Sequence, residues 1–507
     1  MSRKYFSIFL LMVVMICCVS AASATDGDNI TVPEDTDVIE VDDAVDSVGT
    51  VEQNRGTDTC DGTDCNCEIE TPTLPTTSNS ITLNTSNYGD KFTDCVFNDA
   101  SVDEVIFDNG NYISTNYTTL KFNQTIKITA TGATFNNIGF EFLHDGIVLN
   151  GATIIINAPE NNDFYAIDIE GASNSIIINN KINYTCGFDN DVNYNYAIKA
   201  MDSENLTIYG NEINATVPLK QPNWYAVSTI ASDYVAGVAV GSCNNFRFDK
   251  NNLTVIGNKR VGGFPTLDAF IIAQSANAKI RGNTIRESDT VTTTNQYSYI
   301  YGIDAYTCNN LTICSNNVIM NGNISNTTYQ GNGTGAAYCI QLTGPHTGVK
   351  ICNNNLTTKN QGPNLGIYSQ NYYGETSITV CGNHIDVTGK AGSDPWSLVS
   401  GMELQDNYAD VYGNTIDVTN VDGATGGYIY GISYCQSTSG NHTYNITNNT
   451  VRVPDGEYAV YLDGVTGSNV SYNYLVAERN EGDSAVEIIG DSTNHIGNNT
   501  PWFERKF

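Results

Sequence analysis

The chain has 507 residues, with 55 Asp and Glu against 23 Lys and Arg, and a formal net charge of -32. This balance excludes nucleic acid as an expected partner, because binding to it depends on Lys and Arg that neutralise phosphates. The same charge favours solubility of an exported chain.

Residues 1–24 carry a short basic start, an apolar run and a small-x-small exit at Ala22-Ser23-Ala24. This pattern predicts a secretory signal peptide. An uncleaved membrane anchor is the alternative, but the apolar run is shorter than the ~20 residues that a span needs. No other apolar stretch of spanning length follows, so we expect a secreted, extracellular protein at the cell surface, with no transmembrane segment apart from the signal.

The next segment is strongly acidic: residues 25–70 hold fifteen Asp and Glu and a single base, Arg55. A segment of this composition cannot bury enough apolar surface to offset its ordering entropy, which predicts a flexible acidic leader over 25–74. A calcium site is the alternative, but the spacing of the acids matches no calcium loop.

Three cysteines, Cys60, Cys65 and Cys67, end this leader. Zinc is a competing interpretation, but the second ligand pair that such a site requires is not nearby. We therefore expect neither a metal nor another cofactor.

One phrase recurs through the rest of the chain, as NLTIYGNEI at 205–213, NLTICSNNV at 310–318 and SITVCGNHI at 377–385. The separation between copies varies from 24 residues (Asn449 to Asn473) to 40 (Asn211 to Asn251). Helical-pair repeats need a near-constant length, so loops of variable length on a fixed strand framework explain this period better. The asparagines at the seventh position of the phrase are Asn180, Asn211, Asn251, Asn283, Asn316, Asn354, Asn383, Asn414, Asn449, Asn473 and Asn499.

A second phrase precedes most of these asparagines, as YAIDI at 165–169, YAIKA at 196–200 and YGIDA at 301–305. Both phrases alternate with the period of two that is typical of strands. Glycines before the asparagine, such as Gly210 and Gly282, suit a turn with positive φ. One coil of two or three strands cannot bury its own inner face, but eleven stacked coils form a continuous core. In such a stack we expect the asparagines to be scaffold, passing amide hydrogen bonds from coil to coil.

The I-x-x-N-x-[ILV] phrase with a preceding YAI or YGI strand resembles the right-handed parallel β-helix repeats of the pectin-lyase-like superfamily. The signal peptide, acidic leader and Asn-, Thr- and Tyr-rich coils are together similar to adhesin-like surface proteins of methanogenic archaea. The resemblance implies an all-β chain with one β-solenoid of about a dozen coils: an N-terminal cap and opening coils over 75–160, repeats over 161–500, and a tail over 501–507. The same scaffold carries lyases, hydrolases, epimerases and adhesins, so it does not decide activity.

Enzymes of this fold place their chemistry on the outward face of one sheet. The residues two beyond each small position of the second phrase are Asp168, Lys199, Ala239, Ile271, Asp304, Gln341, Glu403, Tyr461 and Glu487. Glycoside hydrolysis needs two carboxylates roughly 5 to 10 Å apart, and the nearest approach to such a catalytic pair is Asp463 with Glu487. Asp168 faces Lys199, which predicts a surface ion pair. The acid clusters and basic residue of a lyase, and the NTD and DD motifs of a hydrolase, are absent from the coils, which points away from cleavage.

A carbohydrate-binding surface needs fewer specific residues than a catalytic site. Tyrosine, which suits such a surface, is common, with 30 residues. Tyr306, Tyr368 and Tyr461 are expected on or near the same outward face, where aromatic rings beside polar groups suit sugars. The alternative is that Tyr simply favours half-buried strand surfaces.

Two covalent features follow from the repeat. Cys314, Cys352 and Cys381 precede their asparagines by two residues in consecutive coils, so they should stack about 4.8 Å apart, within the Cα range of a disulfide. A Cys314 to Cys352 bridge is the preferred hypothesis, and a stack of reduced thiols is the alternative. Sequons of an exported chain are candidates for glycosylation, among them Asn205, Asn310, Asn326, Asn332 and Asn441.

The sequence thus favours a cell-surface, adhesin-like β-solenoid whose partners are carbohydrates, host surfaces or envelope molecules. A carbohydrate-active enzyme and a passive envelope spacer are the alternatives, and the oligomeric state is left open.

Overall fold

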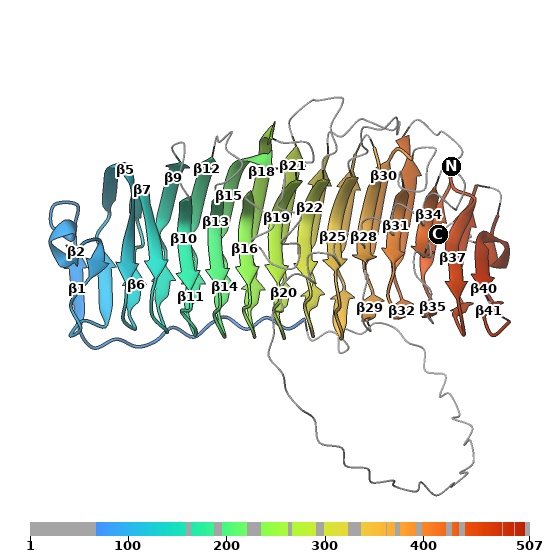
Figure 1. The fold of residues 1–507 in the computed structure, drawn as a ribbon, viewed down its shortest axis with the longest axis horizontal. Helices are drawn as coiled ribbons and strands as arrows, with labels where there is room; N and C mark the ends of the chain where they lie inside the picture. The colour runs from blue at the N-terminus through green and yellow to red at the C-terminus, as the bar shows by residue number, and fades with distance from the viewer. Residues whose placement is uncertain are drawn as a thin grey trace, which may run out of the picture. The chain divides into compact units, whose positions relative to one another are not determined.

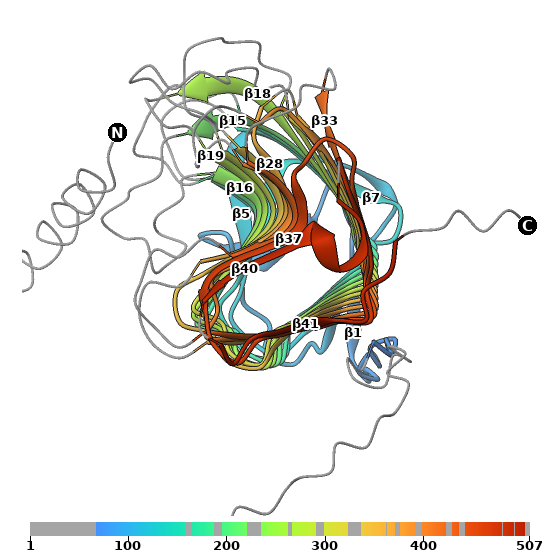
Figure 2. The ribbon, with the colours of Figure 1, turned by 90° about the vertical axis from the view of Figure 1, so that its right-hand side faces the viewer.

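The computed structural model describes residues 67–158, 164–186, 195–220, 235–261, 266–289, 299–322, 336–360, 362–370, 376–391, 398–421, 428–434, 442–478, 480–490 and 492–501. These residues form a right-handed parallel β-helix in which successive coils stack along the horizontal axis of Figure 1. Seen from its end, each coil is a closed loop of three strands (Figure 2). The predicted fold class is confirmed. None of the helices in the described ranges is long and apolar enough to cross a membrane.

Each coil contributes one strand to each of three faces, in the chain order sheet 1, sheet 3, sheet 2. Sheet 1 has fifteen strands, and twenty-six further strands form one hydrogen-bonded system that bends around the coil as sheets 2 and 3. In sheet 1 they are β1 (Ser80–Leu83), β4 (Glu104–Phe107), β6 (Lys127–Thr129), β8 (Val148–Asn150), β11 (Ile176–Ile178), β14 (Thr207–Tyr209), β17 (Arg247–Asp249), β20 (Lys279–Arg281), β23 (Thr312–Cys314), β26 (Val349–Cys352), β29 (Ser377–Cys381), β32 (Tyr408–Tyr412), β35 (Thr443–Thr447), β38 (Asn469–Ser471) and β41 (His495–Gly497). In sheet 2 they are β10 (Phe164–Glu170), β13 (Asn195–Met201), β16 (Val235–Gly241), β19 (Thr266–Ala273), β22 (Tyr299–Tyr306), β25 (Ala336–Thr343), β28 (Asn364–Gln370), β31 (Val399–Leu404), β34 (Ile429–Tyr434), β37 (Tyr458–Val465) and β40 (Val486–Gly490). In sheet 3 they are β9 (Thr153–Ala158), β12 (Lys181–Cys186), β15 (Glu212–Lys220), β18 (Asn252–Val261), β21 (Thr284–Asp289), β24 (Asn317–Asn321), β27 (Asn355–Lys359), β30 (His384–Gly389), β33 (Thr415–Asn420), β36 (Thr450–Val453) and β39 (Tyr474–Ala477).

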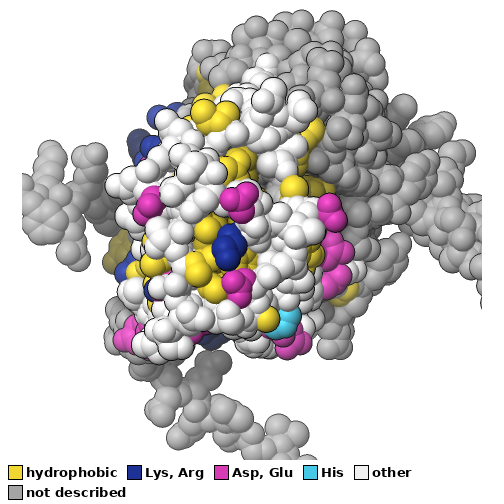
Figure 3. All heavy atoms as spheres, turned by 90° about the vertical axis from the view of Figure 1, so that its left-hand side faces the viewer, with side chains coloured by type: hydrophobic (Ala, Val, Ile, Leu, Met, Phe, Trp, Pro, Cys, Tyr) yellow, Lys and Arg dark blue, Asp and Glu magenta, His cyan; other side chains and the backbone are white. Residues whose placement is uncertain are grey.

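A cap closes the N-terminal end of the solenoid. It consists of the 3-10 turn η1 (Tyr88–Lys91) and the antiparallel pair β2 (Phe92–Thr93) and β3 (Val96–Phe97), and it leads into the long strands β5 (Gly110–Phe122) and β7 (Ala133–Phe142). The rings of Phe92, Phe97 and Phe122 pack with centroids 5.7 to 5.9 Å apart. Figure 3 shows this end, where acidic side chains lie around the rim and hydrophobic ones gather near the centre. The cap therefore shields the core where an open end would expose it.

The recurring asparagines form a continuous ladder at the corner between sheets 1 and 3. In a typical rung, Asn354 Oδ1 accepts hydrogen bonds from the backbone N and from Nδ2 of Asn316, both at 3.0 Å. Asn354 Nδ2 in turn donates to the Ile313 carbonyl and to Asn383 Oδ1, both at 2.9 Å. The amide thus satisfies buried turn groups on both neighbouring coils, which explains why Asn recurs. The pattern runs from Asn180 to Asn499.

The last rung of this ladder ends on a carboxylate. Asn499 donates from its backbone N and from Nδ2 to Asp483 Oδ1, at 2.9 and 2.8 Å. Asp483 lies in the 3-10 turn η5 (Gly482–Ala485), so the turn supplies the acceptor that the next coil would have provided.

The residue before each asparagine adopts a left-handed conformation. Gly210 and Gly282 both have φ of 63°, and Asn353 and Ser315 take the same conformation at 56° and 57°. The predicted turn is confirmed, and it is not restricted to glycine.

A second row of asparagines lies at the exposed corner between sheets 2 and 1. Asn205 Nδ2 donates to Asn174 Oδ1, and Asn310 Nδ2 donates to Asn277 Oδ1, at 3.0 and 3.1 Å. Two of the candidate sequons, Asn205 and Asn310, therefore stand exposed in this row, and their glycosylation stays a prediction. Asn326, Asn332 and Asn441 lie outside the described residues.

The cysteine stack exists, but the preferred bridge is wrong. Cys314, Cys352 and Cys381 are in register on β23, β26 and β29. No disulfide joins Cys314 to Cys352: Cys314 contacts the thiol of Cys67, while Cys352 takes part in a different disulfide. The prediction considered only the repeats. It missed the segment that begins at Cys67, which packs on this stack.

That segment is the start of the described chain. Residues 67–79 run along the outer face of sheet 1 toward β1, at the lower edge of Figure 1, and we call residues 67–71 the strap. Residues 67–74 were predicted to belong to a flexible leader. The composition of this segment did not predict that it packs on sheet 1, because the contacts are made by backbone carbonyl groups, which every residue has. The signal peptide and the leader up to residue 66 lie outside the described residues.

Candidate functional site

The outer face of sheet 2 carries two rows of outward side chains that follow the axis of the solenoid. The register of the parallel strands aligns the residues of the first row as the sequence predicted, and it adds Tyr368 and Ser433. The first row is Asp168, Lys199, Ala239, Ile271, Asp304, Gln341, Tyr368, Glu403, Ser433, Tyr461 and Glu487. The second row is Tyr165, Tyr196, Ala236, Asp268, Tyr301, Tyr338, Leu365, Ser400, Tyr430 and Tyr458.

The small residue of the YGI phrase separates the two rows. A Cβ on Gly302 would lie 2.6 Å from Val318 Cγ1 and 2.7 Å from the Cys339 carbonyl oxygen, so only a very small residue fits there. Tyr301 and Asp304 on either side of Gly302 and Ile303 then both point outward, while Ile300 and Ile303 are in the core. The local crowding thus positions a polar row beside an aromatic row.

Tyrosines stack along this face in two groups. In the first group, the Tyr338 ring lies 5.3 Å from both the Tyr301 ring and the Tyr368 ring. In the second, the Tyr430 and Tyr461 rings stack at 4.9 Å with an interplanar angle of 18°. Leu365, Leu398 and Tyr430 form a buried apolar cluster, against which Tyr338, Tyr368, Tyr428, Tyr458 and Tyr461 pack as half-buried side chains. The five half-buried rings therefore keep part of their surface accessible, whereas Tyr301 and Tyr430 are buried.

Two carboxylates flank the first tyrosine group. Asp268 and Asp304 come from neighbouring strands, and both raise the pKa of Tyr301, whose burial is the main cause of that shift. Asp304 has no exposed surface, and Asp268 has 1 %. The sequence search found Asp304 and missed Asp268, which stands in the second row where most coils have Tyr. Aligning LDAFI at 267–271 on its small residue, Ala269, would have revealed it.

A third carboxyl, Glu403, lies between Tyr368 and Ser433 in the first row. Burial raises the pKa of Glu403 to about 7, and a hydrogen bond from Gln405 Nε2 at 3.3 Å opposes this shift. Near neutral pH this side chain can therefore either donate or accept a hydrogen bond.

The predicted ion pair at the N-terminal end of the face is confirmed. Lys199 Nζ lies 3.3 Å from Asp168 Oδ1 and 3.2 Å from Glu170 Oε2. The ammonium also lies 5.0 Å from the centroid of the Tyr165 ring.

Two of the three tyrosines predicted to bind a ligand, Tyr368 and Tyr461, stand in the first row. Tyr306 lies two residues beyond Asp304 on β22, opposite Ala273 and Thr343, and packs on a smaller cluster around Ala239 and Ile271. The structure thus places all three on one sheet face but does not bring them together.

The candidate catalytic pair is only half buried. The register sets Glu487 opposite Tyr461 and Asp463 opposite Ile489, and Glu487 hydrogen-bonds the Tyr458 hydroxyl. Catalysis by Asp463 and Glu487 stays a prediction. Within the part of the chain that the structure describes, no group of three or more His, Cys, Asp or Glu side chains is arranged to hold a metal ion.

Comparisons with known proteins describe the fold alone. No family model matches the sequence, and no curated protein matches it. A solved DFA-IIIase from Arthrobacter chlorophenolicus is similar over 79 % of this chain and 89 % of its own, at 11 % identity and a TM-score of 0.34. The alginate lyase AlyF-OU02 is similar over 76 % of this chain and 82 % of its own, at 12 % identity and a TM-score of 0.36. A further alginate lyase, in complex with a trisaccharide, covers 82 % of this chain and 93 % of its own, at 10 % identity and a TM-score of 0.31.

Proposed function

We propose that this protein is a cell-surface, adhesin-like β-solenoid that holds an extended carbohydrate against the outer face of sheet 2. The observation that carries the proposal is the two stacked tyrosine groups on one face, Tyr301–Tyr338–Tyr368 and Tyr430–Tyr461, in which Tyr338, Tyr368 and Tyr461 are half-buried. The proposal rests on this chain's own residues.

The arrangement has the chemistry that sugars require. A sugar ring has an apolar face that packs on an aromatic ring and a rim of hydroxyls that need hydrogen-bond partners. Glu403, which is half-buried, supplies such a partner in the same row as Tyr368 and Tyr461. Because parallel strands repeat about every 4.8 Å, the face offers similar contacts to successive units of a polymer.

A second candidate function is cleavage of a polysaccharide, and the carboxylates of Asp268 and Asp304 favour it. Neighbouring coils are about 4.8 Å apart, which suits the separation of two catalytic carboxylates, roughly 5 to 10 Å. Binding is better supported, because a general acid has to reach the glycosidic oxygen, whereas Asp304 and Asp268 are buried.

One experiment separates these functions. The purified full chain is incubated with pectin, alginate, cellulose oligosaccharides and a mixed glycan array, and both retention and new reducing or unsaturated ends are measured. We expect retention without new ends. New ends that disappear in Asp304→Asn and Asp268→Asn would establish the enzyme instead. Absence of retention on every glycan would leave the passive envelope spacer.

A further inference from the structure

The strap crosses four neighbouring coils of sheet 1, nearly at right angles to their strands. Cys67 packs on the cysteine stack that begins at β23, Glu68 contacts β20, Glu70 contacts β17 and Thr71 contacts β14. Three coil steps are about 14 Å, so four residues have to span them at ~3.6 Å each, close to the limit of an extended chain. The strap therefore has a fixed register on the sheet.

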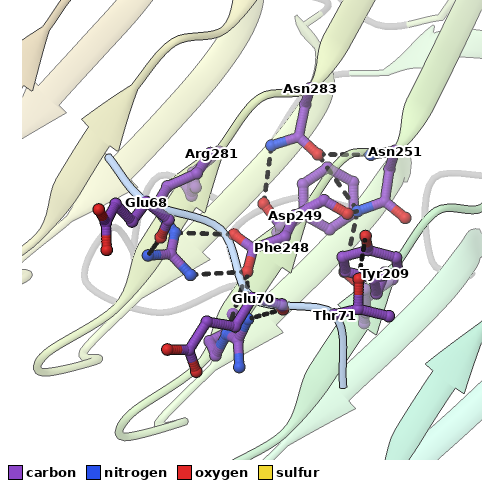
Figure 4. Close-up of polar contacts among 12 residues, drawn as sticks. Glu68, Glu70, Thr71, Tyr209, Phe248, Asp249, Asn251, Arg281 and Asn283 are labelled. Carbon is purple, nitrogen blue, oxygen red and sulfur yellow. Dashed lines mark hydrogen bonds and ion pairs between the residues drawn. The ribbon is translucent and has the colours of Figure 1, made fainter. Parts of the chain in front are cut away.

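Two arginines fix that register through the strap's backbone, as Figure 4 shows. Arg281 Nη1 donates to the Glu68 carbonyl at 2.6 Å, and Arg247 Nη2 donates to the Glu70 carbonyl at 2.8 Å. Carbonyls two residues apart point to the same side of an extended chain, so both can face the sheet.

The guanidinium groups are themselves held by Asp249, which is fully buried. Asp249 accepts from Arg281 at 3.0 and 2.8 Å and from Arg247 at 3.0 Å. Arg281 pairs with Asp249 in a bidentate way that leaves its Nη1 pointed at the strap, whereas the Nη2 of Arg247 contacts both Asp249 Oδ2 and the strap. A residue of the sheet, Asp249, thus orients both donors toward the strap.

This register sets Cys67 over Cys314. Arg281 and Cys314 are opposite each other on β20 and β23, and Arg281 holds the residue that follows Cys67. Cys67 packs on the cluster formed by Cys314, Cys352, Cys381 and Tyr412, and its thiol hydrogen-bonds that of Cys314.

We propose that Cys67 and Cys314 form a disulfide that fastens the strap to the outer face of sheet 1. The other two members of the stack are engaged elsewhere. Cys352 is already disulfide-bonded, and Cys381 Sγ lies 2.9 Å from Cys352 Sγ. Cys314 is thus the member of the stack that Cys67 bridges.

The reaction needs a small-molecule disulfide as oxidant. The half-buried Cys67 thiol attacks it, forms a mixed disulfide and releases one small thiol. The Cys314 sulfur then attacks the Cys67 sulfur and releases the second small thiol, so that two protein thiols and one disulfide give one protein disulfide and two small thiols. Burial and the hydrogen bond to Cys67 raise the pKa of the Cys314 thiol, and the Arg281 guanidinium opposes that shift only in part, so the second step is expected to be the slower one.

Mass spectrometry of the full chain tests the bridge. The folded protein is equilibrated with oxidised and reduced glutathione, alkylated and digested without reduction. We expect a peptide joining Cys67 to Cys314 as the main product of these two residues. Cys95→Ser, which changes a half-buried cysteine near the N-terminal cap, should leave this product unchanged.

Limited proteolysis measures how firmly the disulfide holds the strap on sheet 1. Cleavage between residues 71 and 79 should be about tenfold slower in the oxidised protein than in Cys67→Ser, because cleavage requires local release of the strap. Cys67→Ser removes a group from the strap alone, so this comparison holds even if Cys314→Ser does not fold. Complete alkylation of Cys67 and Cys314 after oxidation would overturn the proposal, and so would a bridge from Cys67 to Cys381 or to a second molecule.

Discussion

Glu287 is a carboxyl inside an apolar core. It lies on the inner side of β21 between Val255 and Met320, and it is 1 % exposed. Within the described chain, neither of its oxygens has a hydrogen-bond partner of good geometry. Burial, with a smaller contribution from Asp289, raises the pKa of Glu287 well above its ordinary value. The side chain is therefore expected to be protonated in the folded state.

Replacement of this residue should stabilise the protein at neutral pH. Because the folded-state pKa is raised, the native state binds more protons, so stability is highest below about pH 4.3 and falls as pH rises toward the folded pKa. Glu287→Gln should gain up to about 3 kcal/mol over the wild type between pH 4.5 and 7. Denaturant unfolding at both pH values measures this, and an equal difference at the two would contradict the burial argument.

A buried histidine also makes the stability of the protein depend on pH, here because a carboxylate lies next to it. His346 Nε2 lies 2.7 Å from Asp406 Oδ1, and Nδ1 donates to the Gly344 carbonyl at 2.8 Å. Burial alone lowers the pKa of His346, but the bond to Asp406 and its charge outweigh it and raise the pKa.

The imidazolium therefore contributes stability that is fully present below about pH 6.5 and is lost as pH rises through the raised pKa. His346→Gln should cost roughly 2 to 4 kcal/mol at pH 6 and distinctly less at pH 9. Thermal unfolding of both proteins across this range checks the sign. A cost that grows with pH would show that the histidine is neutral.

Neither residue could be placed from sequence. TIRESD at 284–289 alternates so that Ile285 and Glu287 share a side, but a charged residue on the inner side contradicts the expected pattern. His346 and Asp406 lie two coils apart, on either side of β28, and no repeat phrase contains either of them.

At the scale of elements, the asparagine ladder is the best-predicted feature. Its residues recur because one turn geometry recurs, so the repeated phrase identified every rung. The strap was missed because its contacts use backbone carbonyls and residues such as Arg281 that occur once. The same contrast explains the disulfide error: the cysteine stack follows the repeat, but Cys67, which packs on it, lies outside the repeat.

Two neighbouring asparagines test what the ladder contributes. The side chain of Asn354 makes four hydrogen bonds in the buried ladder, whereas the side chain of Asn355 makes one on the exposed side of β27. Asn354→Ala leaves several buried groups unsatisfied and should cost about 3 kcal/mol or more, while Asn355→Ala should cost under about 1 kcal/mol. Chemical denaturation of both variants makes the comparison. Equal costs would mean that the ladder follows from the fold and does not stabilise it.

At the scale of the whole molecule, the repeat determines the fold and the departures from the repeat determine the candidate site. The sequence predicted the coil stack and most of the first row, because both have a period. It could not show how far each side chain is covered. Asp304 was expected on an outward face, and it does point outward, yet it has no exposed surface.

The central claim is that the outer face of sheet 2 binds carbohydrate, and affinity electrophoresis through gels containing each polysaccharide of the test panel measures it most directly. The variant Tyr338→Ala with Tyr368→Ala removes two of the three rings of the first tyrosine group. Tyr472→Ala with Tyr474→Ala removes two tyrosines that are 47 % and 49 % exposed and lie outside sheet 2. We predict that the first double variant loses about tenfold or more in affinity, since stacked aromatic contacts each contribute ~1 kcal/mol beyond buried area, and that the second matches the wild type. Equal retardation of both variants, or no retardation of the wild type in any gel, would contradict the account.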